Sequence, residues 1–355
     1  GAGNATADIF SFFQSTNFVS RLIIPYNKKN HINIINYYNR FTIFFYYLLK
    51  FFHRVFSRIV SKHKYYFFNN IFQNSFFSAR KIKEIIKDFQ PDYVMILWYE
   101  YILNYKEIYK IKNTLKVKII IYPFDMYSFT GGCRYSQSCN NFKNNCRNCP
   151  AIILNKIPSG NYKINKFYLR KINPVIFFPS QYALDFANNS KILNKKTKKY
   201  IFYYPVVKKL FSNNNRLGLP SFKIVQQIKK KYNYKNIVFF GSQDGNEWRK
   251  GIYNINRFLK IFEKRFSKTY SETLFVYAGK NIKGLFPQED KNFLVFNFLQ
   301  YQDYYSIYSL ADAVIIPSLQ EWSSLMMSEA VILKKFIFSF NTGSSKDFLI
   351  EDITG

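Results

Sequence analysis

The sequence predicts an α/β protein of two Rossmann-like domains, each built on a parallel sheet, that face a cleft between them. The chain has 355 residues, which is enough for two domains of ordinary size. Short runs of β-branched and aromatic residues alternate with amphipathic segments in two series. Strands that alternate with helices form parallel sheets, whose ligands bind beyond the carboxyl ends of the strands.

The first series occupies residues 1–205 and predicts an N-terminal domain. Aromatic and β-branched runs predict its strands at 18–26, 92–99, 116–123, 174–180 and 199–205. Apolar residues at helical spacing predict helices at 79–89, 106–115 and 181–190. Because these helices lie between the strands, neighbouring strands of this domain are expected to run parallel.

A polar stretch at 206–235, which contains SNNNRLGLPS, predicts a linker. The second series fills 236–355 and predicts a C-terminal domain that is truncated. Its strands are expected at 236–242, 273–280, 293–298, 314–318 and 334–340. Its helices are expected at 251–266, at 301–313 and around residues 321–329. Since the chain starts without Met and stops at EDITG, we expect a fragment that lacks both extreme termini.

The net charge of +31, from 52 Lys and Arg against 21 Asp and Glu, favours an anionic partner such as nucleic acid, an acidic membrane or a phosphorylated substrate. An AT-rich coding bias, which enriches Lys, Asn, Ile, Tyr and Phe, explains the same composition without any partner. The hydrophobic content of 48% argues against wholesale disorder. Basic residues are spread along the chain and no recognition motif is found, so nucleic acid is not expected as a partner.

The densest apolar segment, residues 41–60, is interrupted by Lys50, His53, Arg54 and Arg58. It is too often charged for a membrane span, and no secretory signal is found. Two interpretations remain open. It is either a basic amphipathic helix that lies on an anionic membrane, or a core helix with a cationic face toward solvent.

All four cysteines lie within 17 positions in a C-x5-C-x6-C-x2-C pattern, at Cys133, Cys139, Cys146 and Cys149. Without a secretion signal, a closed structural zinc site is favoured over two disulfides or free thiols. The final C-x2-C is typical of zinc ligands, whereas the first spacing is wider than usual. No His lies nearby in sequence, so a catalytic cysteine is not indicated.

Several polar residues follow predicted strands, where ligands of α/β folds bind. Asp125 follows the strand at 116–123, where it either orients or deprotonates a substrate hydroxyl or caps the next turn. Lys250 lies beside a predicted helix start after the turn at Ser242, which is typical of a diphosphate site. The amino-terminal glycines, including Gly3, resemble half of a phosphate-binding loop.

Glu321 and Glu329 are eight positions apart in PSLQEWSSLMMSEA. If the segment between them is helical, the two carboxylates are separated by about 12 Å along the helix axis. They would then contact hydroxyls at opposite ends of a long ligand such as a nucleotide sugar, or both would face solvent. The amides around Ser323 and Ser324, at the expected helix start, offer a phosphate site.

Five stretches in consistent order resemble the family 4 glycosyltransferases of the GT-B fold, in particular the colanic-acid and capsule branch that has a cysteine loop. They are FDMYSFTGGCRYSQSCNNFKNNCRNCP, FFPSQYALDFA, FFGSQDGNEWRKGI, YSLADAVIIPSLQEWSSLMMSEA and NTGSSKDFLIEDITG. The resemblance implies a retaining hexosyl transfer from a nucleotide-diphosphate sugar to a glycan or lipid-linked acceptor, in cell-surface polysaccharide biosynthesis. It implies no cofactor for catalysis, and a cytoplasmic enzyme that is peripheral at the inner membrane face.

The resemblance also implies roles for single residues. Lys250 would bind the diphosphate, Glu321 would contact donor-sugar hydroxyls, and Glu329 would hold the ribose. The amides of Trp322 and the following serines would assist Glu321. The glycine loop and Ser242 would approach the phosphates, and residues 1–205 would form the acceptor side.

Three positions depart from the family pattern. Phe124 stands where the family has a His before the aspartate, Ser242 where it often has a basic residue, and Ser344 where it has a second glycine after Gly343. The loss of the His motivates a second hypothesis, a catalytically inactive protein that binds sugar nucleotides or glycans. A basic protein that binds nucleic acid is a third and weaker hypothesis, which rests on charge and aromatic content alone.

Overall fold

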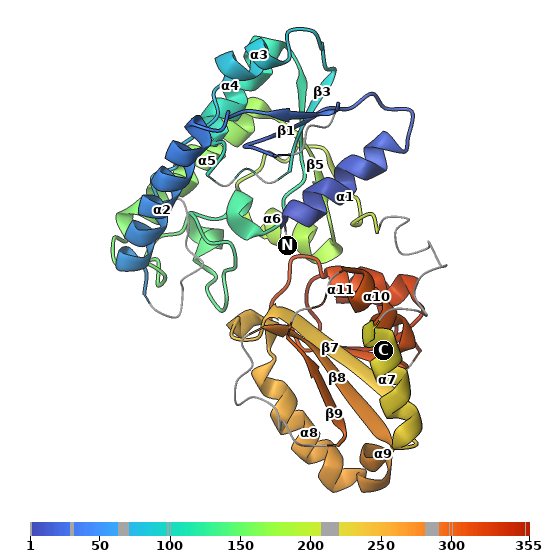
Figure 1. Cartoon of the computed structure of the whole chain (residues 1–355). Coiled ribbons are helices and arrows are strands. Elements are labelled where there is room, and N and C mark those ends of the chain that lie inside the picture. The colour runs from blue at the N-terminus through green and yellow to red at the C-terminus, as the bar shows by residue number, and fades with distance from the viewer. Residues whose placement is uncertain are drawn as a thin grey trace. The chain divides into compact units, whose positions relative to one another are not determined.

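The computed structural model divides into two compact units, residues 1–205 and 206–355 (Figure 1). Both units combine helices with a parallel sheet, which confirms the predicted α/β class. The structure describes residues 2–28, 32–62, 71–97, 99, 101–206, 220–280, 291–297, 299, 301–351 and 353–355, without the side chains of residues 2, 4, 220 and 301.

The first unit contains a four-stranded parallel sheet in the order β3-β4-β5-β6. Its strands are β3 (Tyr93–Ile96), β4 (Lys118–Ile121), β5 (Val175–Phe178) and β6 (Lys199–Ile201). All four fall within strands predicted from β-branched and aromatic runs. The predicted strand at 18–26 forms β1 (Leu22–Ile24), which pairs with β2 (Ile34–Asn36) in a separate parallel sheet.

The helices of the first unit are α1 (Ala2–Gln14), α2 (Thr42–Val60), α3 (Ala79–Ile85), α4 (Tyr105–Leu115), α5 (Lys156–Ile172) and α6 (Gln181–Ser190). Side-chain caps define three of the starts, because Ser78, Asn104 and Ser180 each accept a backbone N–H from the first turn of the helix. Helix α5 was not expected from the sequence.

The expected glycine loop at the amino terminus is instead the start of helix α1. Gly3 lies in its first turn, and an added Cβ at this position would meet nothing within 4 Å. The physical reason is the run that follows, in which Ala5 and Ile9 are one helical turn apart and both are buried. Packing of this face therefore outweighs the helix-breaking tendency of glycine.

The second unit contains a five-stranded parallel sheet in the order β11-β10-β7-β8-β9. Its strands are β7 (Asn236–Asp244), β8 (Thr273–Lys280), β9 (Phe293–Phe296), β10 (Ala313–Ile316) and β11 (Phe336–Ser339). Phe239 and Phe240 on the central strand β7 belong to two different core clusters and are both fully buried. Apolar cores therefore cover both faces of this sheet, as is usual for parallel sheets.

The helices of the second unit are α7 (Pro220–Lys231), α8 (Tyr253–Arg265), α9 (Ser267–Ser271), α10 (Tyr301–Leu310), α11 (Leu325–Ile332) and α12 (Ser345–Phe348). Helix α7 occupies part of the segment at 206–235 that was expected to be a linker. Phe222 and Val225, three positions apart, are buried and fix the helix on the unit. Residues 207–219 lie outside the described residues.

The central strand predicts a large difference between two identical substitutions. We expect Phe239→Ala to lower the free energy of unfolding by about 3–5 kcal/mol, because it leaves a cavity in a closed core. We expect Phe338→Ala, on strand β11 with a side chain that is 51% exposed, to cost less than about 1 kcal/mol. Urea unfolding of the two variants measures both values, and equal losses would contradict the core assignment.

Candidate functional site

Glu321 lies in the loop between β10 and α11 and not on the helix. Helix α11 begins at Leu325, and the side chain of Ser324 caps it by accepting the backbone N–H of Met327 at 3.3 Å. The helix start expected around Ser323 and Ser324 is confirmed, whereas the condition that the whole segment from Glu321 to Glu329 is helical is not met, because the Ser324 cap begins the helix after Glu321. The two glutamates are not separated by two helical turns.

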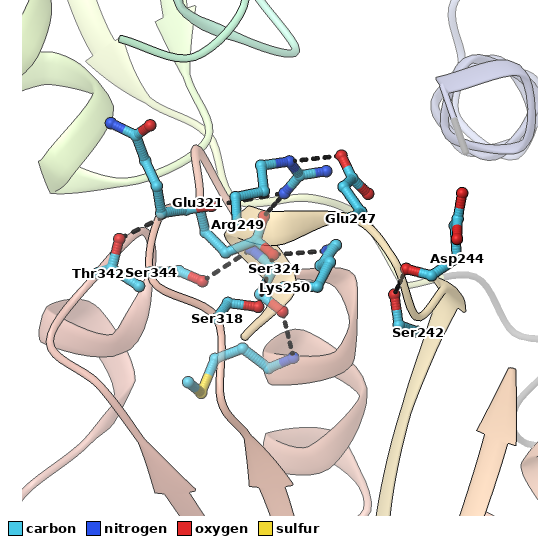
Figure 2. Close-up of polar contacts among 12 residues, drawn as sticks. Ser242, Asp244, Glu247, Arg249, Lys250, Ser318, Glu321, Ser324, Thr342 and Ser344 are labelled. Atoms are coloured by element: carbon cyan, nitrogen blue, oxygen red, sulfur yellow. Dashed lines mark hydrogen bonds and ion pairs between the residues drawn. The ribbon is translucent and has the colours of Figure 1, made fainter. Parts of the chain in front are cut away.

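The carboxylate of Glu321 is buried and is bound by three side chains (Figure 2). Its Oε1 pairs with Lys250 Nζ at 2.5 Å and accepts the Ser318 hydroxyl at 2.9 Å. Its Oε2 pairs with Arg249 Nη1 at 2.9 Å. A buried carboxylate costs free energy unless such partners replace water, so this cluster is held as one unit.

Arg249 connects the turn after β7 to the loop after β10. Its Nε donates to Glu247 Oε1 at 2.8 Å, and its backbone carbonyl accepts the N–H of Leu319 at 2.7 Å. The guanidinium therefore lies between the carboxylates of Glu247 and Glu321. We name the five side chains of Glu247, Arg249, Lys250, Ser318 and Glu321 the Glu321 cluster.

Two glycines allow the backbone segments around Glu321 to approach each other. Gly251 has a φ of 65°, and a Cβ there would overlap the carbonyl of Pro317. Gly343 has a φ of 59°, and a Cβ there would lie 2.7 Å from the Cβ of Glu321. Both positions combine a left-handed backbone with a close contact, so only glycine fits without strain. Nearby, Thr342 Oγ1 accepts the N–H of Glu321 at 3.1 Å.

The charges of the cluster keep Glu321 ionised. Burial by itself would raise the pKa of this carboxyl, but the positive charges of Lys250 and Arg249 act in the opposite direction. Hydrogen bonds from Lys250 and Ser318 add to them, and the pKa of Glu321 is lowered from its ordinary value as a result. The site therefore presents a carboxylate that accepts hydrogen bonds and does not donate a proton at neutral pH.

Glu329 lies on α11 among tyrosine hydroxyls. Its Oε1 accepts the Tyr305 hydroxyl at 2.6 Å, and its Oε2 accepts the Tyr304 hydroxyl at 3.3 Å. Burial, together with the negative charge of Glu329, raises the pKa of Tyr308 well above its ordinary value. The Tyr308 hydroxyl donates to the carbonyl of Met326 at 2.7 Å, which fixes the first turn of α11 on α10.

The other donor-side residues predicted from the sequence have different environments. The Ser242 hydroxyl donates to the carbonyl of Asp244 at 2.8 Å, and no bond joins it to the Glu321 cluster in Figure 2. Trp322 is fully buried, so its indole anchors the loop from inside. Ser323 is half-buried, and the N–H of Ser324 donates to the Ser344 hydroxyl at 3.4 Å. Of the predicted donor residues, the structure brings Lys250, Glu321 and the start of α11 together.

In the first unit, Asp125 is buried and both of its oxygens have partners. Its Oδ1 accepts the N–H of Tyr127 at 2.9 Å and thereby caps a short 3-10 helix, and its Oδ2 pairs with Arg134 Nε at 2.9 Å. This is the capping interaction that the sequence left open. The neighbouring Phe124, in place of the family's His, packs edge-on against Tyr122 with ring centroids 5.6 Å apart.

The four cysteines line one small cavity of about 10 Å³ in the first unit. Cys146 Sγ accepts the N–H of Gly131 at 3.1 Å, and Cys139 Sγ accepts the N–H of Asn141 at 3.4 Å. A hydrogen bond from Cys133 is the main reason that the pKa of Cys149 is lowered, to about 7. Among the residues that the structure describes, no group of three or more His, Cys, Asp or Glu is already arranged to hold a metal ion.

A much larger apolar cavity of about 1610 Å³ also lies in the first unit. Residues of α1, of α2 and of the strands β1 and β3 line it, together with Arg134. Arg134, which pairs with Asp125, is thus part of the wall of this cavity. The Glu321 cluster, which belongs to the second unit, does not contribute to it.

No protein-family model matches the chain, and no curated protein sequence matches it. Solved structures do match. A UDP-forming α,α-trehalose-phosphate synthase from Burkholderia xenovorans aligns with a TM-score of 0.54 at 9% identity, over 76% of this chain and 63% of that one. A trehalose-6-phosphate protein from E. coli, described as bound with UDP-2-fluoro glucose, aligns with a TM-score of 0.52 at 8% identity over the same shares. The fold is GT-B.

Since the chain spans less than two thirds of the length of these proteins, and identity is low, the likeness establishes the GT-B fold alone. Within this fold, sequence reasoning missed several partners of the predicted residues. Ser318 and Thr342 lie within the stretches that resemble the family, and Arg249 is next to Lys250 in sequence. Their position beside predicted site residues was therefore a signal that could have identified these three. No sequence pattern indicated that Tyr304 and Tyr305 bind Glu329.

The lowered pKa of Glu321 predicts how acid affects stability. A carboxyl with a lower pKa in the folded than in the unfolded protein stabilises the fold above its ordinary pKa of 4.5, and this contribution is lost as pH falls through the folded pKa. We expect Glu321→Gln to lower the unfolding free energy at pH 7 by about 3 kcal/mol, because Lys250 loses its buried partner. The difference from the unsubstituted protein should shrink below pH 4.5.

Urea unfolding at pH 7 and in a series down to pH 3 measures this difference. Glu263→Gln, at an exposed glutamate on α8, serves as the matched control and should change stability by less than about 0.5 kcal/mol. A Glu321→Gln penalty that is independent of pH would contradict the ionised, paired state of Glu321.

Proposed function

We propose that the protein is a retaining glycosyltransferase of the hexosyl type that uses a nucleotide-diphosphate sugar as donor. The acceptor is a glycan or a lipid-linked saccharide in cell-surface polysaccharide biosynthesis. The observation that carries the proposal is the Glu321 cluster in a GT-B fold. Its buried, ionised carboxylate belongs to the loop just before α11, and the two cations Arg249 and Lys250 pair with that carboxylate. Two similar structures are described as UDP-forming or as bound with a UDP sugar, which supports the donor class.

The donor would be held by complementary parts of this cluster. The Lys250 side chain is 25% exposed, so its ammonium can reach an entering diphosphate while it stays close to Glu321. The first N–H groups of α11 and its dipole favour the same negative charge. Glu321, ionised and fixed in direction, would accept hydrogen bonds from sugar hydroxyls, and Glu329 with its tyrosines would bind the ribose.

The proposed catalytic contribution is stabilisation of the departing diphosphate. The bond between the sugar's anomeric carbon and the diphosphate oxygen breaks while the acceptor's hydroxyl oxygen bonds to that carbon, and the hydroxyl proton passes to the departing diphosphate. The negative charge that develops on the diphosphate is met by Lys250 and the amides of α11. Neither glutamate has to act as a nucleophile. Both oxygens of Glu321 are engaged with cations, and both oxygens of Glu329 accept tyrosine hydroxyls. No cofactor is part of this proposal.

The acceptor side of the proposal rests on the first unit. The apolar cavity of about 1610 Å³ has room for the hydrocarbon part of a lipid-linked saccharide. Arg134 in its wall would pair with a phosphate of such an acceptor, and Asp125 would position the guanidinium for this contact. These features favour a lipid-linked acceptor over a free glycan.

A second candidate function is favoured by Phe124 and Asp125. The family's imidazole is absent at Phe124, and the carboxylate of Asp125 is engaged with Tyr127 and Arg134. A protein with these properties would bind a sugar nucleotide and not transfer the sugar. Binding and turnover therefore have to be measured separately.

We also propose that the four cysteines hold a structural zinc ion. Four thiols around one cavity form the donor set of a closed tetrahedral site, and the N–H groups of Gly131 and Asn141 that point at sulfur would stabilise bound thiolates. Binding requires side-chain rotations that bring each sulfur to about 2.3 Å from a common centre. Such an ion would fasten the loop after η2 (Met126–Phe129).

A nucleotide screen tests the donor proposal. We expect one of UDP, GDP and ADP to raise the melting temperature of the protein, and the matching sugar nucleotide to be hydrolysed slowly or transferred. Lys250→Met should lower kcat by about 10²-fold to 10³-fold, because it removes the charge that meets the leaving group. Thermal shift and coupled release of the nucleoside diphosphate are the measurements.

Lys260→Met, at an exposed lysine on α8, is the matched control and should leave both readouts unchanged. Nucleotide binding without hydrolysis or transfer to any acceptor would support the inactive binding protein. The absence of binding to every nucleotide, with salt-dependent oligonucleotide binding instead, would reject both proposals.

Metal analysis tests the zinc proposal. We expect about one zinc per chain in protein purified without chelator, and a lower melting temperature after chelation. Cys146→Ser should abolish zinc retention, whereas Ser136→Ala, in the same loop, should not. Four titratable thiols in protein without zinc would show that the cysteines are free. No titratable thiols before reduction would show two disulfides.

A further inference from the structure

Helix α2 packs on the first unit with one side and exposes an apolar stripe on the opposite side. The residues that it buries are Ile43, Tyr46, Ser57 and Val60. At 3.6 residues per turn these four positions share one face, and seven of the nine exposed large apolar side chains of α2 share a face of roughly 120° on the opposite side. These seven residues, which we name the α2 stripe, are Phe44, Phe45, Leu48, Phe51, Phe52, Val55 and Ile59. The other two, Tyr47 and Leu49, lie on its flanks.

The α2 stripe is too large to be ordinary surface. Each of its seven side chains is between 39% and 68% exposed, and four of them are phenylalanine. Single exposed apolar residues are common, but a contiguous patch of this kind marks a surface that another phase or molecule covers. The sequence had left open a core helix with a cationic outer face. The outer side does carry the exposed Arg54 and Arg58, but most of it is apolar.

The charges beside the stripe indicate the chemistry of its partner. Helix α2 contains no Asp or Glu, and Arg54 and Arg58 lie one turn apart along one edge of the stripe, both exposed. Lys50, one turn before Arg54, lies closer to the packed side of the helix, over the rings of Tyr46 and Tyr101. An apolar face with a cationic border and no acidic residue is typical of helices that lie in the surface of an anionic bilayer.

Two alternatives, a second copy of the chain on the α2 stripe and a helix that spans the bilayer, fit these observations less well. A second copy of the chain would bring Arg54 and Arg58 close to the same residues of its partner, and like charges at an apolar contact oppose association. Spanning the bilayer is also disfavoured. Within the part of the chain that the structure describes, none of the helices combines the length and apolar character that crossing a membrane requires.

We propose that α2 docks the protein on an anionic membrane surface. The helix lies parallel to the bilayer, the α2 stripe enters the boundary between headgroups and acyl chains, and Arg54 and Arg58 pair with lipid phosphates. This proposal does not depend on the proposed transferase reaction. It gives the large positive charge of the chain a function, because that charge attracts the protein to an anionic surface before the stripe inserts.

Vesicle co-sedimentation of the full chain tests the docking. We expect binding to vesicles of phosphatidylcholine with about one third phosphatidylglycerol, weaker binding to pure phosphatidylcholine, and a decrease with salt. The double substitution Phe51→Ser and Phe52→Ser should lower binding at least 10-fold, because two rings no longer enter the bilayer. Arg54→Gln with Arg58→Gln should lower binding to the anionic vesicles about 10-fold and change binding to neutral vesicles little.

Matched controls lie on other helices. Phe167→Ser with Phe258→Ser removes two comparably exposed rings on α5 and α8, and Arg257→Gln with Arg265→Gln removes two exposed charges on α8. Both double variants should bind as the unsubstituted protein does. Equal losses in stripe and control variants, or no vesicle binding by the unsubstituted protein, would overturn the proposal.

Tryptophan depth measurements give a second readout that does not require loss of binding. Fluorescence of Phe52→Trp should be quenched by brominated lipids in anionic vesicles, whereas fluorescence of Phe258→Trp should not. Sedimentation velocity without vesicles tests whether a second copy of the chain covers the α2 stripe. Dimers that disappear with Phe51→Ser and Phe52→Ser, without quenching by brominated lipid, would assign the stripe to a second copy of the chain.

Discussion

The burial of Glu321 is the constraint on which the second unit's site depends. A carboxylate on a side chain that is only 5% exposed is stable only with close partners, and here they come from two separate turns. Those turns approach because Gly251 and Gly343 have no Cβ where Pro317 and Glu321 need the space. The motifs RKG, PSLQE and NTG, which are distant in sequence, therefore form a single structural unit.

Charge balance within this unit has a functional consequence. Arg249 and Lys250 are matched by Glu247 and Glu321, so the cluster is locally neutral in a chain whose net charge is +31. The overall field would attract an anionic donor without selecting it. Selection would come from the direction of the ionised Glu321 and from the reach of Lys250, both of which the buried pairs fix.

The two units differ in the kind of surface that they offer. The second unit gathers paired charges, hydroxyls and a helix start, which suit a polar, phosphorylated ligand. The first unit has an apolar cavity with Arg134 in its wall and an exposed apolar stripe on α2, which suit ligands or surfaces with hydrocarbon. The proposed reaction, between a water-soluble donor and a lipid-linked acceptor, would require one polar binding surface and one apolar binding surface.

The sequence by itself determined the parallel α/β series, because strand and helix periodicity are local properties, and its short motifs indicated Lys250, Glu321 and Glu329 as candidate site residues. It indicated a helix start around Ser323 and Ser324, but it also allowed a helix from Glu321, and only the backbone of the folded loop shows that Glu321 lies outside α11. Lys250 and Glu321, 71 positions apart, were paired by tertiary packing alone. Packing also decided α2, because its sequence has two apolar faces and only the folded unit shows which one is covered.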